Sequence, residues 1–240
     1  MQTFKVLSIL LGYPSAAVYR ALDELGDALR SEALLTPAQQ TPVLALIDWM
    51  RGQSLLELQE TYVGLFDRGC KLSLHLFEHT HGDSRERGPA MVHLLRQYED
   101  AGFTLAAREL PDYLPLVLEF AAQLPLAEAR ALLAECMPVL TLMGARLHAR
   151  GSPYAALFDA LEAIAGPAEE AERLRRQAAE EGPDESITRL DEIWMEEAVT
   201  FLQAERAPGH SRGTPYAGGA QPVRWNLSEA HGTPVSGSKE

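Results

Sequence analysis

Residues 152–167, SPYAALFDALEAIAGP, decide the fold class, because they contain a complete helix signal. Ser152 and Pro153 are favoured at the start of a helix. Gly166 and Pro167 end the pattern, since proline cannot continue the hydrogen-bond ladder. Between them, apolar residues recur at helical spacing: Tyr154, Leu157, Phe158, Leu161 and Ile164. The stretch therefore predicts one amphipathic helix with marked ends.

The rest of the chain repeats this kind of signal. Thr36 with Gln39, and Ser54 with Glu57, have the spacing of capping boxes, so two more helices are expected to begin there. The chain contains 37 Leu and 34 Ala but only 15 Val and Ile together, an excess of helix formers over β-branched residues. We therefore predict an all-α protein built as a single compact helical bundle.

Composition divides the 240 residues into four parts. Residues 1–166 carry the amphipathic patterns and form the predicted helical core. Residues 167–186 are mostly Ala, Glu and Arg with no apolar stripe, as in a charged linker or a solvated helix. Residues 187–206 predict a C-terminal amphipathic helix. Residues 207–240 contain six Gly, four Pro and four Ser, which predicts a disordered tail.

Charge and cysteine content narrow the class of protein. The formal net charge is -13 and the sequence pI is about 5.0, which disfavours nucleic acid and anionic membranes as partners and favours basic ones. Cys70 and Cys136 are too few for a disulfide framework and suit a reducing compartment. No apolar run approaches the ~20 residues of a membrane span, and the N-terminal residues lack a clear signal-peptide cleavage site. We expect a cytoplasmic protein without membrane insertion.

A long linker at residues 67–88 is the first region of functional interest, because it is rich in Gly, His and charge and has no clear period. Its candidate ligating side chains are His75, Glu78, His79, His81 and Asp83. Their spacing matches no standard metal site, so we expect no metal and interpret the histidines as capping and packing groups. Arg85 and Arg87, between Gly82 and Gly88, resemble an anion-binding loop, but no Walker lysine accompanies them.

The second region is residues 109–120, ELPDYLPLVLEF. Asp112 is expected to cap the N-terminus of the helix that begins here, using its carboxylate on backbone N–H groups. Glu109 and Glu119 remain available. No nucleophile accompanies them, so they suit an acidic wall for a basic peptide better than acid–base catalysis. Tyr62 and Phe66, one helical turn apart in an earlier segment, are expected to belong to the core.

These segments carry a resemblance to a known family. The run YVGLF at 62–66, the block LSLHLFEHTHGDSRERGPAM at 72–91 and the segment 109–120 resemble the nitrate reductase branch of the TorD/DmsD/NarJ family of redox-enzyme maturation chaperones. The resemblance covers residues 4–201. Pro111 and Asp112 match a Pro-Asp-His element of that family, but Tyr113 stands where many relatives have histidine, which puts any role of that imidazole in doubt here.

The resemblance implies an all-helical, cytoplasmic chaperone that is not an enzyme. Such proteins bind the N-terminal segment of a molybdoenzyme's apo catalytic subunit until bis-molybdopterin guanine dinucleotide and iron–sulfur clusters have been inserted, and they bind no cofactor stably themselves. For this branch, the client is the catalytic subunit of respiratory nitrate reductase. Proteins of molybdenum cofactor biosynthesis are further candidate partners.

We expect the client peptide to lie in a groove between helices near residues 72–88 and 109–120. The candidate contact residues are His75, Glu78, His79, Asp83, Arg85, Arg87, Glu109, Asp112, Tyr113 and Glu119. Tyr62, Phe66 and Pro111 are the structural residues of the motif. Two alternatives from other classes stay open on the sequence: an acidic helical adaptor unrelated to cofactor assembly, and a histidine-rich metalloprotein.

Overall fold

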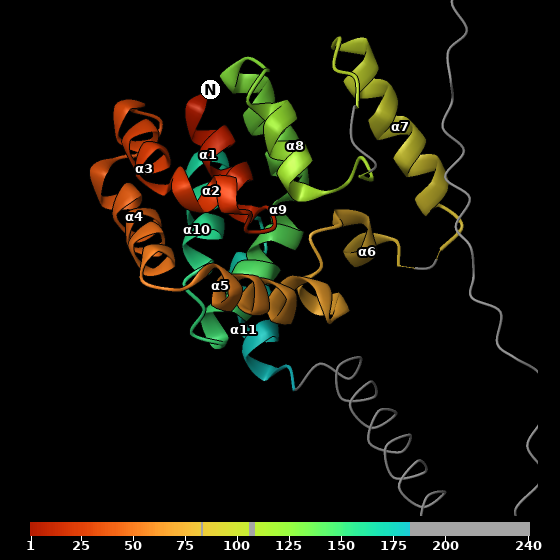
Figure 1. Cartoon of the computed structure of the whole chain (residues 1–240). Coiled ribbons are helices and arrows are strands. Elements are labelled where there is room, and N and C mark those ends of the chain that lie inside the picture. Colours follow the sequence, from red (N-terminus) through yellow and green to blue (C-terminus); the bar gives the residue numbers. More distant parts are fainter. Residues whose placement is uncertain (83, 106–108, 183–240) are drawn as a thin grey trace, which may run out of the picture. The chain divides into compact units, whose positions relative to one another are not determined.

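A computed structural model describes residues 1–82, 84–105 and 109–182 of the chain (Figure 1). The amphipathic helix predicted at 187–206, the disordered tail predicted at 207–240 and the candidate residue Asp83 lie outside the described residues. The regular elements in the described part of the chain are helices, and the only β pairing found there is one isolated bridge. The all-α prediction is therefore confirmed.

The elements follow one another along the chain without a repeat. In order they are α1 (Gln2–Leu11), α2 (Ala16–Arg20), α3 (Leu22–Ser31), α4 (Pro37–Arg51), α5 (Leu55–Tyr62), the π-helix η1 (Val63–Asp67), the 3₁₀-helix η2 (Cys70–Leu72), α6 (Leu76–Thr80), α7 (Arg87–Asp100), α8 (Leu114–Ala121), α9 (Leu126–Ala149), α10 (Ala155–Ala165) and α11 (Ala171–Glu180). The region 67–88, predicted as a linker without a clear period, thus contains η2, α6 and the start of α7.

Local signals fix where several helices begin and end. Both predicted capping boxes form: Gln39 Oε1 accepts a 2.9 Å hydrogen bond from Thr36 N, and Glu57 Oε2 accepts one of 2.8 Å from Ser54 N. The helix predicted from Ser152 begins three residues later, because 3₁₀-type turns occupy the intervening residues. It ends as predicted at Gly166, whose φ of 92° favours glycine.

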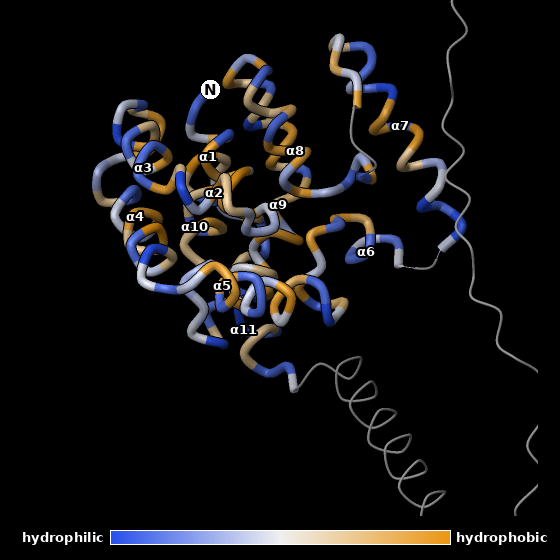
Figure 2. The backbone as a smooth tube through the Cα atoms, viewed as in Figure 1, coloured by the Kyte–Doolittle hydropathy of each residue, from blue (hydrophilic) through white to orange (hydrophobic). Residues whose placement is uncertain are grey.

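The main core is built around α9, which contacts α6, α8, α10, α11 and η2. This helix continues through Pro138 as one element, and its buried face includes Leu133, Leu140 and Leu147. Hydrophobic and hydrophilic colours alternate along the tube of α4 in Figure 2. The buried apolar residues of this helix recur at helical spacing: Val43, Leu46, Ile47 and Met50. Amphipathic periodicity therefore accounts for the packing of both helices.

A smaller cluster of aromatic side chains attaches α7 to α8 and to the segment before it. Tyr98 of α7 packs against Phe120 of α8 with ring centroids 4.5 Å apart, and Phe103 lies 5.9 Å and 5.6 Å from these two rings. The Tyr98 hydroxyl is buried and donates a 2.7 Å hydrogen bond to the carbonyl of Pro111. This bond ties α7 to the segment that leads into α8.

The helix α11 lies within the range 167–186, for which composition predicted a charged linker or a solvated helix. Ala171, Leu174 and Ala178 are buried, and the helix packs against α9. Two of the three residues are alanines, so the apolar stripe is narrow among the charged residues of this segment. Packing against α9 uses this narrow face.

No helix among the residues that the structure describes is long and apolar enough to cross a membrane.

We expect Gly144→Ala to destabilise the protein. A Cβ at Gly144 of α9 would lie 2.9 Å from Cβ of Phe158 in α10, an atom that cannot move without its backbone. Overpacking of this kind costs about 1–3 kcal/mol, and denaturant unfolding would measure it. Gly88→Ala is the control, since nothing lies within 4 Å of its added Cβ. Equal stability of the Gly144 variant and the wild type would contradict the close approach of the two helices.

Candidate functional site

The two segments singled out in the sequence meet through a short backbone bridge. His75 and Tyr113 pair in an antiparallel arrangement. Leu114 N donates to the Leu74 carbonyl at 2.8 Å, and Leu76 N donates to the Asp112 carbonyl at 3.1 Å. The start of α6 and the start of α8 are thereby fixed side by side.

Asp112 strengthens this junction with its side chain, which is fully buried. One carboxylate oxygen accepts a 3.0 Å hydrogen bond from Phe77 N in the first turn of α6, and the other accepts one of 3.3 Å from His75 Nδ1. The prediction that Asp112 caps its own helix is wrong: α8 begins after Tyr113 without a side-chain cap. The antiparallel bridge turns the Asp112 carboxylate toward α6 instead. A fully buried carboxylate cannot contact a peptide directly. Asp112 therefore contributes to the site by holding His75 and the first turn of α6 in place.

The two nearby histidines have different electrostatic environments. The hydrogen bond from His75 to Asp112 raises the pKa of the His75 imidazole, and the charges of Glu78 and Glu109 add to this effect. Burial lowers the pKa of His79, whose Nε2 donates a 2.8 Å hydrogen bond to the Ser73 carbonyl. Within the described residues no three His, Cys, Asp or Glu side chains gather in a way that could hold a metal ion.

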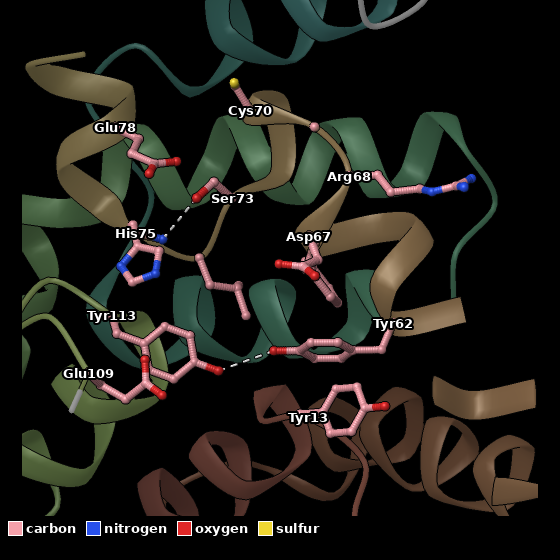
Figure 3. Close-up of a pocket in the computed structure, with 13 residues that line it drawn as sticks. Tyr13, Tyr62, Asp67, Arg68, Cys70, Ser73, His75, Glu78, Glu109 and Tyr113 are labelled. Atoms are coloured by element: carbon pink, nitrogen blue, oxygen red, sulfur yellow. Dashed lines mark hydrogen bonds between the residues drawn. The ribbon is translucent and has the colours of Figure 1, made fainter. Parts of the chain in front are cut away.

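A pocket of about 520 Å³ opens in front of the junction (Figure 3). The candidate residues His75, Glu78 and Tyr113 line it together with Glu109. The complete lining is Tyr13, Tyr62, Phe66, Asp67, Arg68, Gly69, Cys70, Ser73, Leu74, His75, Glu78, Glu109 and Tyr113. Residues from all three segments that carry the family resemblance, 62–66, 72–91 and 109–120, line this pocket.

Aromatic side chains form one side of this pocket. The hydroxyl groups of Tyr62 and Tyr113 lie 3.1 Å apart, and the Tyr62 hydroxyl is also 3.1 Å from the Leu11 carbonyl, to which it donates. Tyr13 packs edge-on against Tyr62 with centroids 5.5 Å apart, and Phe66 lies 5.1 Å from Tyr62. Tyr62 and Phe66 are buried in the main core and still border the pocket. Burial raises the pKa of Tyr62, which keeps its hydroxyl protonated.

Carboxylates outnumber permanent cations around the pocket. Asp67, Glu78 and Glu109 line it with Arg68, and Arg87 approaches Glu78 with 3.3 Å between Nη2 and Oε1. Two other charged candidates are elsewhere on the surface: Glu119 and Arg85 are exposed and do not line this pocket. Of the two glutamates from which the sequence predicted an acidic wall, Glu109 lines the pocket and Glu119 does not.

Several lining residues did not stand out in the sequence. Asp67 and Arg68 were not among the candidate residues, although they begin the region 67–88 and directly follow the YVGLF run. The π-helix Val63–Asp67 brings Phe66 and Asp67 to the pocket, and π-helical turns are often found at functional sites. Tyr13 lies far away along the chain, and no local pattern connects it with this site.

We expect His75 to titrate above the ~6.5 of an ordinary histidine, because the Asp112 carboxylate accepts a hydrogen bond from its protonated ring. Asp112→Asn should lower the titration midpoint, which imidazole resonances in an NMR titration would report. Glu119→Gln is the control, since Glu119 is exposed and outside the pocket. A His75 midpoint below that of an ordinary histidine would refute the pairing.

The same raised pKa has a consequence for stability. Protonated His75 stabilises the fold fully below its unfolded-state pKa of ~6.5, and this contribution is lost as the pH rises through the higher folded-state pKa. His75→Gln should therefore destabilise the protein more in mildly acidic than in alkaline solution. Denaturant unfolding of both chains at the two pH values measures the difference.

Comparisons with known proteins identify the family of this chain. The nitrate reductase delta subunit family matches residues 15–160. The chain is 40% identical over 227 residues to the nitrate reductase molybdenum cofactor assembly chaperone NarJ of Escherichia coli (strain K12), covering 93% of this chain and 96% of that protein.

Two further relatives have similar descriptions. The probable nitrate reductase molybdenum cofactor assembly chaperone NarW of Escherichia coli (strain K12) is 40% identical over 85% of each chain. The probable chaperone NarJ of Bacillus subtilis (strain 168) is 36% identical over 66% of this chain and 85% of that protein. By the family match and by these identities, the chain belongs to the nitrate reductase delta subunit family.

Proposed function

We propose that this protein is a cytoplasmic chaperone dedicated to respiratory nitrate reductase. It binds the N-terminal segment of the apo catalytic subunit and keeps that subunit competent for the insertion of bis-molybdopterin guanine dinucleotide and iron–sulfur clusters. In this role the protein catalyses no reaction and binds no cofactor stably. It is not part of the mature enzyme. Molybdenum cofactor biosynthesis proteins are proposed as additional partners. The names of the relatives, which are nitrate reductase molybdenum cofactor assembly chaperones, support the assignment.

The observation that supports the proposal is the pocket that residues of the three motif segments line. Its carboxylates, Asp67, Glu78 and Glu109, favour a peptide with Lys or Arg side chains. Its aromatic side offers apolar contact, and Tyr13 is 51% exposed beside it. An amphipathic segment with basic and apolar residues would match both parts of the surface.

Apolar contact should supply most of the affinity. Exposed ion pairs contribute about 0.2–1 kcal/mol each, whereas micromolar binding requires about 8 kcal/mol. Three carboxylates are therefore insufficient to hold the client alone. They orient the peptide and discriminate against acidic segments.

We expect a synthetic peptide of the client's first residues to bind in calorimetric titration. Glu109→Gln should weaken binding by about fivefold at most, because it removes one exposed ion pair. Glu78→Gln should have no larger effect, because Glu78 is half-buried and already pairs with Arg87. Added salt should weaken binding of the wild type by screening.

Glu119→Gln is the matched control for this titration, since it removes an equal charge from α8 outside the pocket. Its affinity should equal that of the wild type. If the wild type fails to bind at high micromolar peptide, the proposed function is wrong. If all three variants bind alike, the acidic wall plays no part in recognition.

A further inference from the structure

Arg146 of α9 joins three separate parts of the chain outside the pocket. Its Nε and Nη2 donate to the two carboxylate oxygens of Glu181 at 2.8 and 2.7 Å. Its Nη1 donates to the Lys71 carbonyl at 2.6 Å. The two charged side chains are only 12% and 19% exposed. Such a bidentate pair attracts the two side chains electrostatically and also fixes their relative orientation.

Lys71 completes the arrangement from the other direction. Its Nζ lies 3.6 Å from a Glu181 oxygen and donates a 3.1 Å hydrogen bond to the Gly182 carbonyl. The hydrogen bonds from Arg146 lower the pKa of Glu181, so the carboxylate stays ionised. The backbone and the side chain of Lys71 are thus both tied to the end of α11 through this group.

The backbone held in this way forms a wall of the pocket. Lys71 lies in the 3₁₀-helix Cys70–Leu72, and Cys70, Ser73 and His75 line the pocket around it. A short 3₁₀ turn has poorer hydrogen-bond geometry than an α-helix, and here the bond from Ser73 N to the Cys70 carbonyl is 3.4 Å long. The bond from Arg146 therefore adds an anchor at the start of this wall, whose other end is held by the backbone bridge at Leu74 and Leu76.

We propose that Arg146 and Glu181 are positioning residues, which fix residues 70–75 and so set the shape of the peptide pocket without touching the peptide. This inference rests on the proposed function and adds to it. It gives α11, which follows the matched region 15–160, a role at the binding site. Loss of Glu181 should disturb the wall that carries Ser73 and His75.

The chain offers a matched control. Arg175 of α11 pairs with Glu162 of α10, with 2.5 Å between Nη2 and Oε1, and this pair attaches α11 to α10 and does not touch η2. Glu162→Ala therefore weakens the anchoring of α11 by one ion pair, whereas Glu181→Ala does so and also releases the Lys71 carbonyl from a fixed donor. Both changes are made in the full chain.

We expect Glu181→Ala to reduce affinity for the client peptide by about three- to tenfold, the effect of losing charge-assisted hydrogen bonds at a distance. Amide hydrogen exchange at residues 70–75 should become faster, and the titration midpoint of His75 should shift. Glu162→Ala should leave all three measurements unchanged. If the effect were only a loss of overall stability, the His75 titration midpoint would not shift in Glu181→Ala while staying unchanged in Glu162→Ala.

The outcomes separate this inference from the proposed function. Absence of peptide binding by the wild type would overturn the proposed function, while hydrogen exchange and the His75 midpoint would still decide whether Glu181 fixes the wall. Unchanged exchange at residues 70–75 in the Glu181 variant would overturn the positioning role. So would equal changes in both variants, because these would show a general effect of loosening α11.

Discussion

The pocket depends on the hydrogen bonds that the buried carboxylate of Asp112 accepts. The carboxylate satisfies a backbone N–H of α6 and the ring of His75, while the neighbouring backbone bridge joins the same two segments. A fully buried carboxylate is costly unless it is paired and hydrogen-bonded. Asp112 meets this requirement only when the segments 72–80 and 109–114 lie against each other. Its burial therefore selects the arrangement that creates the pocket.

The sequence predicted the helices best where a local signal marked them. The capping boxes at Thr36 and Ser54 formed because their hydrogen bonds involve residues only three positions apart. The end of α10 at Gly166 followed from a backbone conformation that glycine adopts easily. Such signals do not depend on the rest of the fold.

The site was predictable only in part, because its contacts are long-range. The motifs located His75, Glu78, Glu109 and Tyr113, but the partner of Asp112 depends on a bridge between distant segments. Tyr13 joins the pocket through its contact with Tyr62, which no local pattern encodes. The sequence did not predict the burial of α11 for a related reason. Its apolar face consists mainly of alanine and is narrow, so its contribution to packing becomes evident only in the contact with α9.

The lining of the pocket also has a consequence for the order of folding. Tyr13 and Tyr113, which both contact Tyr62, lie a hundred residues apart in the sequence. Contacts of such separation form late, because the entropy of closing a long loop must be overcome first. During synthesis, α1 to α6 can form as they emerge from the ribosome, but the pocket cannot be complete until the chain has been made as far as Tyr113, the last residue that lines it. A nascent copy of the protein therefore lacks the finished pocket, and binding there reports a chain whose folding is already well advanced.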